Sequence, residues 1–337
     1  MHSTAASRPR ALFAMGRRHR DAMFPPAERQ RLTAYVDIDP DHVAEDFDDE
    51  PALKDVEILI TSWGCPVLDE DLLARAPALK AIVHAAGSVK HHVTQACWDR
   101  GIAVSSAAAA NAVPVAEYTV AAILFANKRV LEIGGIYREH RDVSDWSQRF
   151  PGFGNYRRTV GVVGASLIGR KVLELLRPYE LDLLLADPYI DAEQAAALDA
   201  RHVELDELVA DSDVVTLHAP ALPETHHILD ARRLASMRDG ATLINTARGS
   251  LVDTAALTAE AASGRIHAVI DVTEPEVLPA ASPLYSLPNV LLTPHIAGSL
   301  GGELRRITSS AIDEVVRYCS QRPFAHAVHR AALATSA

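Results

Sequence analysis

The chain has 337 residues, 48% hydrophobic and 23% charged, a composition that predicts a globular protein long enough for two domains. Its formal net charge of −11 argues against a nucleic-acid partner, because binding to phosphate backbones requires an excess of Lys and Arg. No apolar run approaches the roughly 18 residues of a membrane span, so we expect no membrane partner either. The 3 cysteines are widely separated and the N-terminus lacks the apolar core of a secretory signal, which together indicate a cytoplasmic protein.

The first 112 residues alternate short apolar runs with helical patterns. We expect strands at 11–15, 56–61, 79–84 and 102–105, and helices at 68–76 and 94–101. An alanine-rich link at 107–112 precedes a long helix predicted from Pro114 to about Arg138, because proline suits the first turn of a helix. These patterns predict a small α/β domain, then a hinge helix, then a loop at 142–156.

The stretch from Thr159 to Gly169, T-V-G-V-V-G-A-S-L-I-G, organises the second half of the chain. Its apolar run ends at Gly164, and Gly169 follows in the first turn of a predicted helix. A second apolar run at 181–186 ends in Asp187. Strand, glycine turn, helix, strand and terminal acid is the order of a dinucleotide-binding βαβ unit.

Asp187 favours NAD over NADP, because a carboxylate there accepts hydrogen bonds from ribose hydroxyls and repels a 2′-phosphate. The alternative is that Asp187 is a turn residue before Pro188. One departure from the fingerprint is Ser166, which stands where the middle glycine lets the backbone approach the pyrophosphate. Either the turn shifts slightly and NAD still binds, or the affinity is weakened.

After Asp187 the alternation of strands and helices predicts a doubly wound parallel sheet. We expect strands at 214–218, 241–245, 266–271 and 290–292, and helices at 230–237, 253–263 and 301–319. The predicted domains are 1–112, 113–301, and 302–337 as a helix returning to the first domain. Ligands bind beyond the carboxyl ends of such strands, where Arg248, Glu276 and His295 would face one cleft.

Three segments in this half carry a family resemblance: N-T-A-R-G at 245–249, D-V-T-E-P-E at 271–276 and L-L-T-P-H-I-A-G at 291–298. They resemble, in order and spacing, the signature segments of the D-isomer-specific 2-hydroxyacid dehydrogenase family. The resemblance covers about residues 80–300. It implies an α/β fold with a Rossmann-type NAD-binding domain and a smaller flavodoxin-like substrate domain. It also implies a homodimer, whose contact we expect in the 114–138 helix and the loop around Trp146.

The same resemblance implies hydride transfer between NAD and a small anionic 2-hydroxy or 2-oxo acid. Arg248 would clamp the carboxylate with its fork of donors, and His295 would exchange the hydroxyl proton. Glu276 would orient the imidazole, although Glu274 is a second candidate for this role. The expected substrate-binding residues are Ala86, Gly87, Ser88, Arg248 and His295. The expected cofactor-binding residues are Gly164, Ser166, Leu167, Ile168, Gly169, Asp187, His218, Pro220, Thr225, Thr246, Ala247, Arg248, Asp271, His295 and Gly298.

Several alternatives stay open. NAD(H)-sensing corepressors that look like this family also keep the fold and the three residues corresponding to Arg248, Glu276 and His295. A formate-type dehydrogenase is a third possibility, although that branch carries an amide in place of Glu276. Arg248 could be a surface salt-bridge residue and His295 a structural histidine. The pairs His91–His92 and His226–His227 have no acid or Cys at ligand spacing, so we expect solvated surface there and no metal site.

Overall fold

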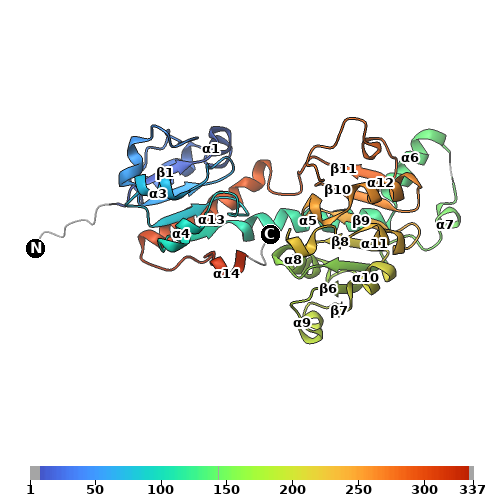
Figure 1. Ribbon diagram of the computed structural model, residues 1–337. Coiled ribbons are helices and arrows are strands. Elements are labelled where there is room, and N and C mark those ends of the chain that lie inside the picture. The colour runs from blue at the N-terminus through green and yellow to red at the C-terminus, as the bar shows by residue number, and fades with distance from the viewer. Residues whose placement is uncertain (1–7, 143, 334–337) are drawn as a thin grey trace, which may run out of the picture. The chain divides into compact units, whose positions relative to one another are not determined.

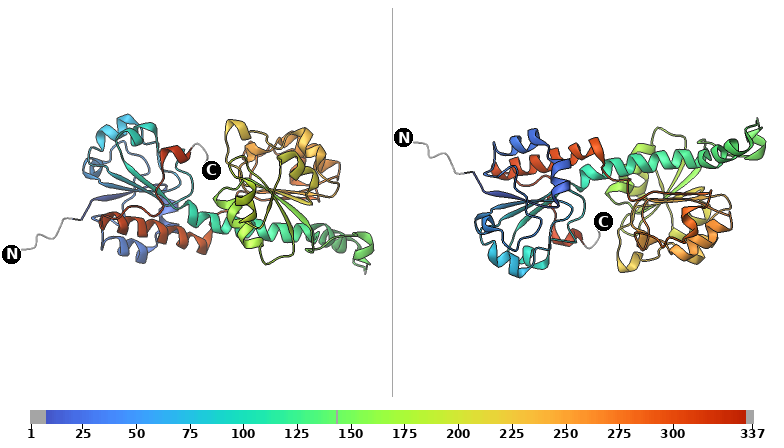
Figure 2. Two further views of the ribbon diagram at one scale, coloured as in Figure 1. Left: turned by 90° about the horizontal axis from the view of Figure 1, so that it is seen from below. Right: turned by 90° about the horizontal axis from the view of Figure 1, so that it is seen from above.

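The computed structural model describes residues 8–142 and 144–333, which form two compact α/β units (Figure 1). Unit 1 contains the described residues up to Ala112 and those from Ser299 onward, and unit 2 contains Val113–Gly298. The ends of the predicted first and last segments, 1–7 and 334–337, lie outside the described residues. Figure 2 shows that helices cover both faces of the sheet in each unit, so the strands can be apolar on both sides.

Unit 1 is built on a parallel sheet with the order β1-β2-β3-β4. Its strands are β1 (Ala11–Ala14), β2 (Ile58–Thr61), β3 (Ala81–His84) and β4 (Ala103–Ser106). Two single parallel bridges, Arg10 with Asp37 and Ala14 with Ala44, place the 37–44 segment beside β1. If the strands are numbered along the chain with the 37–44 segment as the second, their order across the sheet is 2-1-3-4-5. This is the flavodoxin-like order expected from the family resemblance.

The helices of unit 1 bury alternate residues of these strands. They are α1 (Arg17–Met23), α2 (Pro26–Leu32), η1 (Pro51–Asp55), α3 (Glu70–Arg75), α4 (Gln95–Asp99), η5 (Gly301–Glu303), α13 (Leu304–Cys319) and α14 (Arg330–Leu333). Phe13 and Ile60 face one core, which Ile307 and Ile312 of α13 complete, whereas Leu59 faces the other. Helix α13, which follows unit 2 in the chain, is therefore part of the core of unit 1.

Unit 2 is a seven-stranded parallel sheet with the order β11-β10-β9-β8-β5-β6-β7. The strands are β5 (Thr159–Val163), β6 (Asp182–Ala186), β7 (Arg201–His202), β8 (Val214–Leu217), β9 (Thr242–Asn245), β10 (His267–Ile270) and β11 (Val290–Leu292). The order reverses between β5 and β8, which is the switch point of a Rossmann-type doubly wound sheet. The expected fold class is confirmed.

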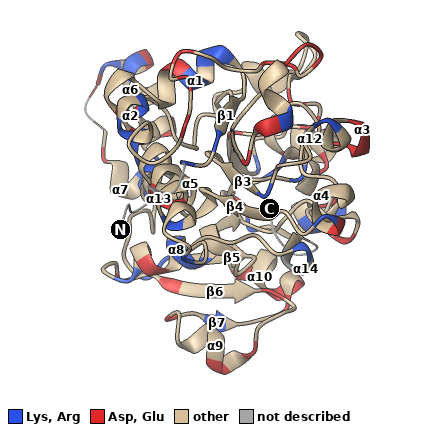
Figure 3. Ribbon diagram, turned by 90° about the vertical axis from the view of Figure 1, so that its left-hand side faces the viewer, with Lys and Arg blue, Asp and Glu red and all other residues tan. Residues whose placement is uncertain are grey.

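The remaining helices of unit 2 pack on the two faces of this sheet. They are α8 (Leu167–Leu176), α9 (Ala192–Ala196), α10 (Leu205–Asp211), η2 (Pro223–Thr225), α11 (Ala231–Ser236), η3 (Gly249–Leu251), α12 (Thr254–Ala262) and η4 (Pro283–Tyr285). Charges of both signs are interspersed along the helices in Figure 3. Asp206 of α10, for example, accepts hydrogen bonds from Arg232 and Arg233 of α11, which lower the pKa of this carboxyl to about 2.

The long helix differs from the sequence prediction. It begins at Ala108 and ends at Asn127 (α5), with Pro114 in its interior, because alanines upstream of the proline favour helix and the Ser106 hydroxyl accepts a hydrogen bond from Ala108 N. Arg129, at φ +50°, separates α5 from α6 (Val130–His140), and α7 (Trp146–Arg149) lies in the predicted loop. Against expectation, α5 is long and apolar enough to cross a membrane by length and composition alone, a test that core helices also pass.

Candidate active site

The loop after β9 holds Arg248 in a fixed backbone conformation. Asn245 Nδ2 donates to the Arg248 carbonyl at 2.8 Å, and Asn245 Oδ1 accepts from Ala247 N at 3.0 Å. Gly249 packs directly on the loop after β10, since a Cβ at this position would lie 2.1 Å from the carbonyl of Thr273. Only glycine permits this approach. The loops that carry Arg248 and Glu276 are therefore in contact.

Arg248 has no acidic partner among the residues that the structure describes. Its Nη1 donates to the Ala247 carbonyl at 2.6 Å, and within residues 8–142 and 144–333 no carboxylate forms an ion pair with its guanidinium. Burial lowers the pKa of this guanidinium below its usual range. A partly buried cation without a counterion is poorly solvated and therefore suited to an anionic ligand. The alternative of a surface salt-bridge arginine does not fit this geometry.

Asp271 braces the loop that carries His295. Its side chain is 2% exposed and accepts hydrogen bonds from Thr293 Oγ1 at 2.6 Å, Ile296 N at 2.8 Å and Ala297 N at 2.9 Å. Its carbonyl accepts from His295 N at 2.8 Å. His295 lies in the left-handed region, at φ +56°, where a non-glycine residue persists only if its surroundings hold it. The sequence suggested a cofactor contact for Asp271, whereas the structure gives its side chain this bracing role.

The structure pairs His295 with Glu276. The distance from His295 Nδ1 to Glu276 Oε1 is 3.0 Å, and both side chains are more than half exposed. Glu274 lies instead beside His226 and His227, at 3.5 and 3.9 Å. A carboxylate on Nδ1 fixes the imidazole tautomer and leaves Nε2 for a ligand. Of the two acids that the sequence left open, Glu276 is the one that contacts the histidine.

The glycine turn has the close packing that a dinucleotide site requires. Gly164 lies at φ +98°, and a Cβ there would be 2.7 Å from Ala219 N, while a Cβ on Gly169 would be 2.0 Å from the Gly164 carbonyl oxygen. Ser166 has an ordinary φ of −65°, and its hydroxyl accepts a hydrogen bond from Gly169 N at 3.3 Å as the N-cap of α8. Leu167 and Ile168 begin α8, so the free amides of its first turn are those expected to bind phosphate.

Asp187 also contributes to this turn. Its Oδ2 accepts from Ala165 N at 2.6 Å and its Oδ1 from Tyr189 N at 2.8 Å. The turn role that the sequence allowed is therefore real. It is compatible with ribose binding, because a carboxylate offers about four acceptor positions. These residues fit a bound NAD.

Several other predicted cofactor residues have structural side chains. His218 is buried beneath the turn, within 3.0 Å of Thr216 Oγ1, and burial lowers its pKa to about 3. Thr225 Oγ1 donates to the Pro220 carbonyl at 2.6 Å, and buried Thr246 contacts the Thr119 hydroxyl at 3.0 Å. Cofactor contacts of these residues, and of Ala247 and Gly298, stay predictions and would involve their backbone.

In unit 1, the expected substrate loop follows β3. Ala86 is 1% exposed, and Gly87 and Ser88 are partly exposed. The same loop contradicts one expectation: His92 is buried and packs with His84, the last residue of β3, at 4.4 Å between ring centroids. The expectation of solvated surface holds for His91, which is exposed, and is wrong for His92, because the return of the loop onto β3 cannot be read from the H-H dipeptide.

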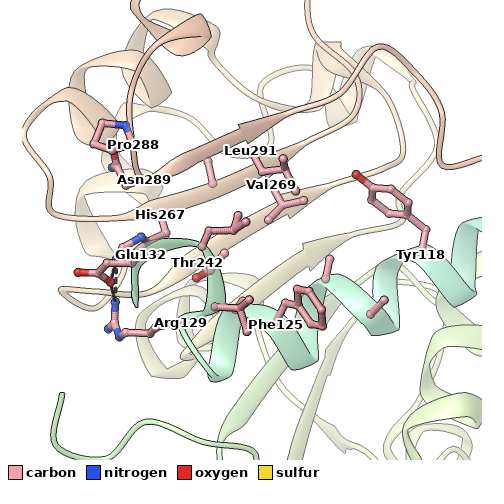
Figure 4. Close-up of a pocket in the computed structure, with 16 residues that line it drawn as sticks. Tyr118, Phe125, Arg129, Glu132, Thr242, His267, Val269, Pro288, Asn289 and Leu291 are labelled. Atoms are coloured by element: carbon pink, nitrogen blue, oxygen red, sulfur yellow. Dashed lines mark hydrogen bonds and ion pairs between the residues drawn. The ribbon is translucent and has the colours of Figure 1, made fainter. Parts of the chain in front are cut away.

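An apolar pocket of about 190 Å³ lies near the other end of the unit 2 strands. Figure 4 shows Phe125 and Tyr118 on α5 facing Val269 and Leu291, with Arg129, Glu132 and His267 at the far end. Arg129 Nη1 donates to His267 Nε2 at 2.7 Å and to Glu132 at 3.1 Å. Thr242 and His267 are the first residues of their strands, so this pocket is separate from the loops that carry Arg248 and His295.

The sheet order, the glycine turn and the groups at the carboxyl edge define a dinucleotide-binding α/β protein of the Rossmann class. The model of the family described as "D-isomer specific 2-hydroxyacid dehydrogenase, NAD binding domain" matches residues 120–297. The chain belongs to this family, as its sequence motifs suggested, and its cofactor is NAD.

Two named relatives carry dehydrogenase and reductase names, and a solved structure shares the fold. Over 268 residues the chain is 31% identical to D-3-phosphoglycerate dehydrogenase of Methanocaldococcus jannaschii, covering 79% of this chain and 50% of that protein. Over 277 residues it is 32% identical to glyoxylate/hydroxypyruvate reductase B of Pectobacterium carotovorum subsp. carotovorum, covering 80% and 84%. The crystal structure of the TT0316 protein from Thermus thermophilus has a TM-score of 0.76 at 29% identity, covering 95% and 100%. The chain spans about half the length of the curated phosphoglycerate dehydrogenases it matches.

Proposed function

We propose that this protein is an NAD-dependent dehydrogenase that interconverts a small D-2-hydroxy acid and its 2-oxo acid. The observation that carries the proposal is Arg248, a partly buried guanidinium without an acidic partner among the described residues, located on a loop in contact with the loop of Glu276. A 2-hydroxy acid supplies the missing anion as its carboxylate. The His295–Glu276 pair at 3.0 Å supplies an acid–base group.

Each side chain has a distinct role in this proposal. NAD, when bound, accepts or donates the hydride. Arg248 binds the substrate carboxylate through two parallel donors, a geometry that lysine cannot reproduce. His295 Nε2 removes the hydroxyl proton in oxidation and returns it in reduction. Glu276 fixes the tautomer and stabilises the imidazolium ion that forms. Ala86, Gly87 and Ser88 of unit 1 stay sequence-based candidates for substrate contacts.

The names of the relatives suggest the substrate class. One is called a D-3-phosphoglycerate dehydrogenase and another a glyoxylate/hydroxypyruvate reductase. Both names describe short 2-hydroxy or 2-oxo acids. We therefore propose a substrate of this size, and glyoxylate and hydroxypyruvate are the first compounds to test.

We also propose a homodimer formed through unit 2. Helix α6 has no buried residue, and Phe125, Val130, Leu131 and Tyr137 are between 38% and 58% exposed. Three of these four side chains line the apolar pocket of Figure 4. Exposed apolar patches of this kind mark interaction surfaces. A second copy of the chain, covering α6 and this pocket, would bury them.

The test is NADH oxidation by the full chain with glyoxylate, hydroxypyruvate, pyruvate, phenylpyruvate and 2-oxoisocaproate, repeated with NADPH and with Arg248→Ala. We expect turnover with NADH, little with NADPH, and a loss of at least about 100-fold in kcat/KM in the variant, because a charge-assisted bidentate contact is removed. Arg201→Ala is the matched control, since Arg201 is an exposed arginine of unit 2 paired with Glu207. It should retain full activity.

Other outcomes would favour the alternatives. Tight NADH binding by fluorescence, without turnover of any 2-oxo acid, would favour an NAD(H)-sensing protein. Reduction of NAD by formate would favour a formate-type dehydrogenase. Unchanged kcat/KM in Arg248→Ala would contradict the proposed role of this residue.

A further inference from the structure

Three histidines of unit 1 form a cluster that the proposed reaction does not use. His84 ends β3, and His91 and His92 lie on the loop that follows it. The ring centroids are 4.4 Å apart for His84 and His92, 4.7 Å for His91 and His92, and 5.9 Å for His84 and His91. One ring nitrogen from each residue can be chosen so that all three lie within 4.8 Å of one another. We call these residues the histidine trio.

Two buried ring nitrogens of the trio make no hydrogen bond to the described residues. His84 and His92 are each 1% exposed, and neither Nε2 of His84 nor Nδ1 of His92 has a hydrogen-bond partner in the described part of the chain. Burial lowers the pKa of His92 to about 3 and holds the pKa of His84 well below its usual range, and the charges of the neighbouring histidines lower both values further. A hydrogen bond between the His84 ring and the Ser88 backbone partly offsets the lowering for His84. Two buried ring nitrogens that lack a hydrogen-bond partner are polar groups in need of a ligand.

Thr61 determines which nitrogens are available. Its Oγ1 lies 2.9 Å from His84 Nδ1 and 3.2 Å from His92 Nε2. A hydroxyl oxygen has two lone pairs, so both rings can donate their N–H groups to it. In that state the lone pairs of the two unpartnered nitrogens are free. A hydrogen bond on the second nitrogen is how metal-binding histidines are commonly held in the required tautomer.

We propose that the histidine trio binds one divalent transition-metal ion of the Zn²⁺ class through three imidazole nitrogens. Imidazole suits Zn, Cu, Fe and Ni, and three histidines leave a fourth position for water or an anion. Zn–N bonds of about 2.0–2.1 Å place tetrahedral ligands about 3.4 Å apart, so ring nitrogens that now lie within 4.8 Å of one another would have to move closer on binding. Exposed His91 can supply this movement by rotating its side chain.

An ion in this site would fasten the 85–90 loop to the end of β3. The loop connects His84 to His91, and it contains Ala86, Gly87 and Ser88, the expected substrate contacts. Metal binding would thus restrain a segment that the proposed reaction uses. The binding itself does not depend on the proposed reaction and can be measured without it.

The structure provides a matched control. His226 and His227 stack at 3.9 Å and approach Glu274, so they too could form a cluster of three ligands. All three of these side chains are between 39% and 54% exposed, and both histidines are therefore solvated. This second cluster has the same dipeptide without the buried, unpartnered nitrogens.

The experiment is a titration of the untagged, chelator-treated full chain with Zn²⁺ and Co²⁺, followed by calorimetry and by the visible absorption of four-coordinate Co²⁺. We expect one ion per chain. His91→Ala, which removes an exposed side chain, should weaken binding at least tenfold without lowering the thermal midpoint of the metal-free protein. Thr61→Val should weaken it about 10- to 100-fold. The double variant His226→Ala/His227→Ala should bind as the unaltered chain does.

Three results would overturn the proposal. One is the absence of stoichiometric Zn²⁺ binding at micromolar concentration. Another is unchanged binding in His91→Ala. The third is binding that is lost only in the His226→Ala/His227→Ala variant, which would move the site to the exposed cluster. None of these readouts requires turnover, so they are distinct from failure of the dehydrogenase assay.

Discussion

The sheet of unit 2 has a carboxyl edge, where its strands end, and an opposite edge, where its strands begin. These two edges differ in how polar groups are used. At the carboxyl edge, Asn245 and Asp271 each satisfy several backbone donors or acceptors and hold the loops of Arg248 and His295. The opposite edge carries an apolar pocket whose exposed wall includes Phe125. Chemistry requires side chains held in place by hydrogen bonds, whereas association requires apolar area to bury. This contrast supports our proposals that the reaction takes place at the first edge and that the dimer forms at the second.

The largest expected effect at the carboxyl edge is that of His295→Gln. Loss of a general acid–base group lowers kcat by about 10²–10⁴-fold, while NADH affinity should be retained because the glycine turn is untouched. Steady-state kinetics and NADH fluorescence separate the two effects. His329→Gln, at an exposed histidine of unit 1, is the control. A variant with normal kcat would show that His295 is a structural histidine.

Asp271→Asn tests whether the brace supports the reactive loop. The carboxylate is 2% exposed and accepts three hydrogen bonds, and an amide in its place would direct N–H groups toward backbone donors. We expect a loss of about 2–4 kcal/mol in the free energy of unfolding by urea, together with a lower kcat. Asp239→Asn, at an 88% exposed carboxylate, should change stability by less than about 0.5 kcal/mol. Wild-type stability in Asp271→Asn would rule out the bracing role.

Leu131→Glu tests the other edge. Leu131 is 45% exposed and lines the apolar pocket, so a dimer contact there would bury it. Burying a leucine is worth about 1.5–3 kcal/mol, which corresponds to a roughly 10- to 100-fold weaker dimer in the variant. Sedimentation velocity over a concentration series measures this change. Leu300→Glu, similarly exposed but in unit 1, should leave the association unchanged. Equal behaviour of the two variants would place the contact elsewhere.

Much of the carboxyl edge could be predicted from sequence because its signals are local. The glycine turn, Asp187 and the segments containing Arg248, Glu276 and His295 are short motifs at strand ends. The helix predicted at 253–263 is another example, because its first residue, Asp253, accepts hydrogen bonds from Ala255 N and Ala256 N as the N-cap of α12. By contrast, the two-residue strand β7 is too short to have a periodic pattern.

Features that depend on distant contacts were not predictable. His84 joins His92 only because the loop after β3 folds back, and Thr61 comes from the neighbouring strand. The bracing role of Asp271 depends on β11 lying beside β10. The break between α5 and α6 at Arg129 is held by hydrogen bonds from Arg129 to Gly240 and His267, which are more than 100 residues away in the sequence. No periodicity within 114–138 encodes these partners.

The smallest expected effect concerns Ser166, where the sequence left two outcomes open. Its φ of −65° shows that this position does not need glycine for its backbone, and its hydroxyl caps α8 through Gly169 N. Ser166→Gly should therefore cost only a few tenths of a kcal/mol, and Ser166→Ala about 1 kcal/mol through loss of the cap. NADH affinity, measured by fluorescence titration, should change less than about tenfold in Ser166→Gly, because the same first-turn amides remain available. A gain larger than tenfold would mean that the serine Cβ obstructs the pyrophosphate and that the chain has weakened its own NAD site.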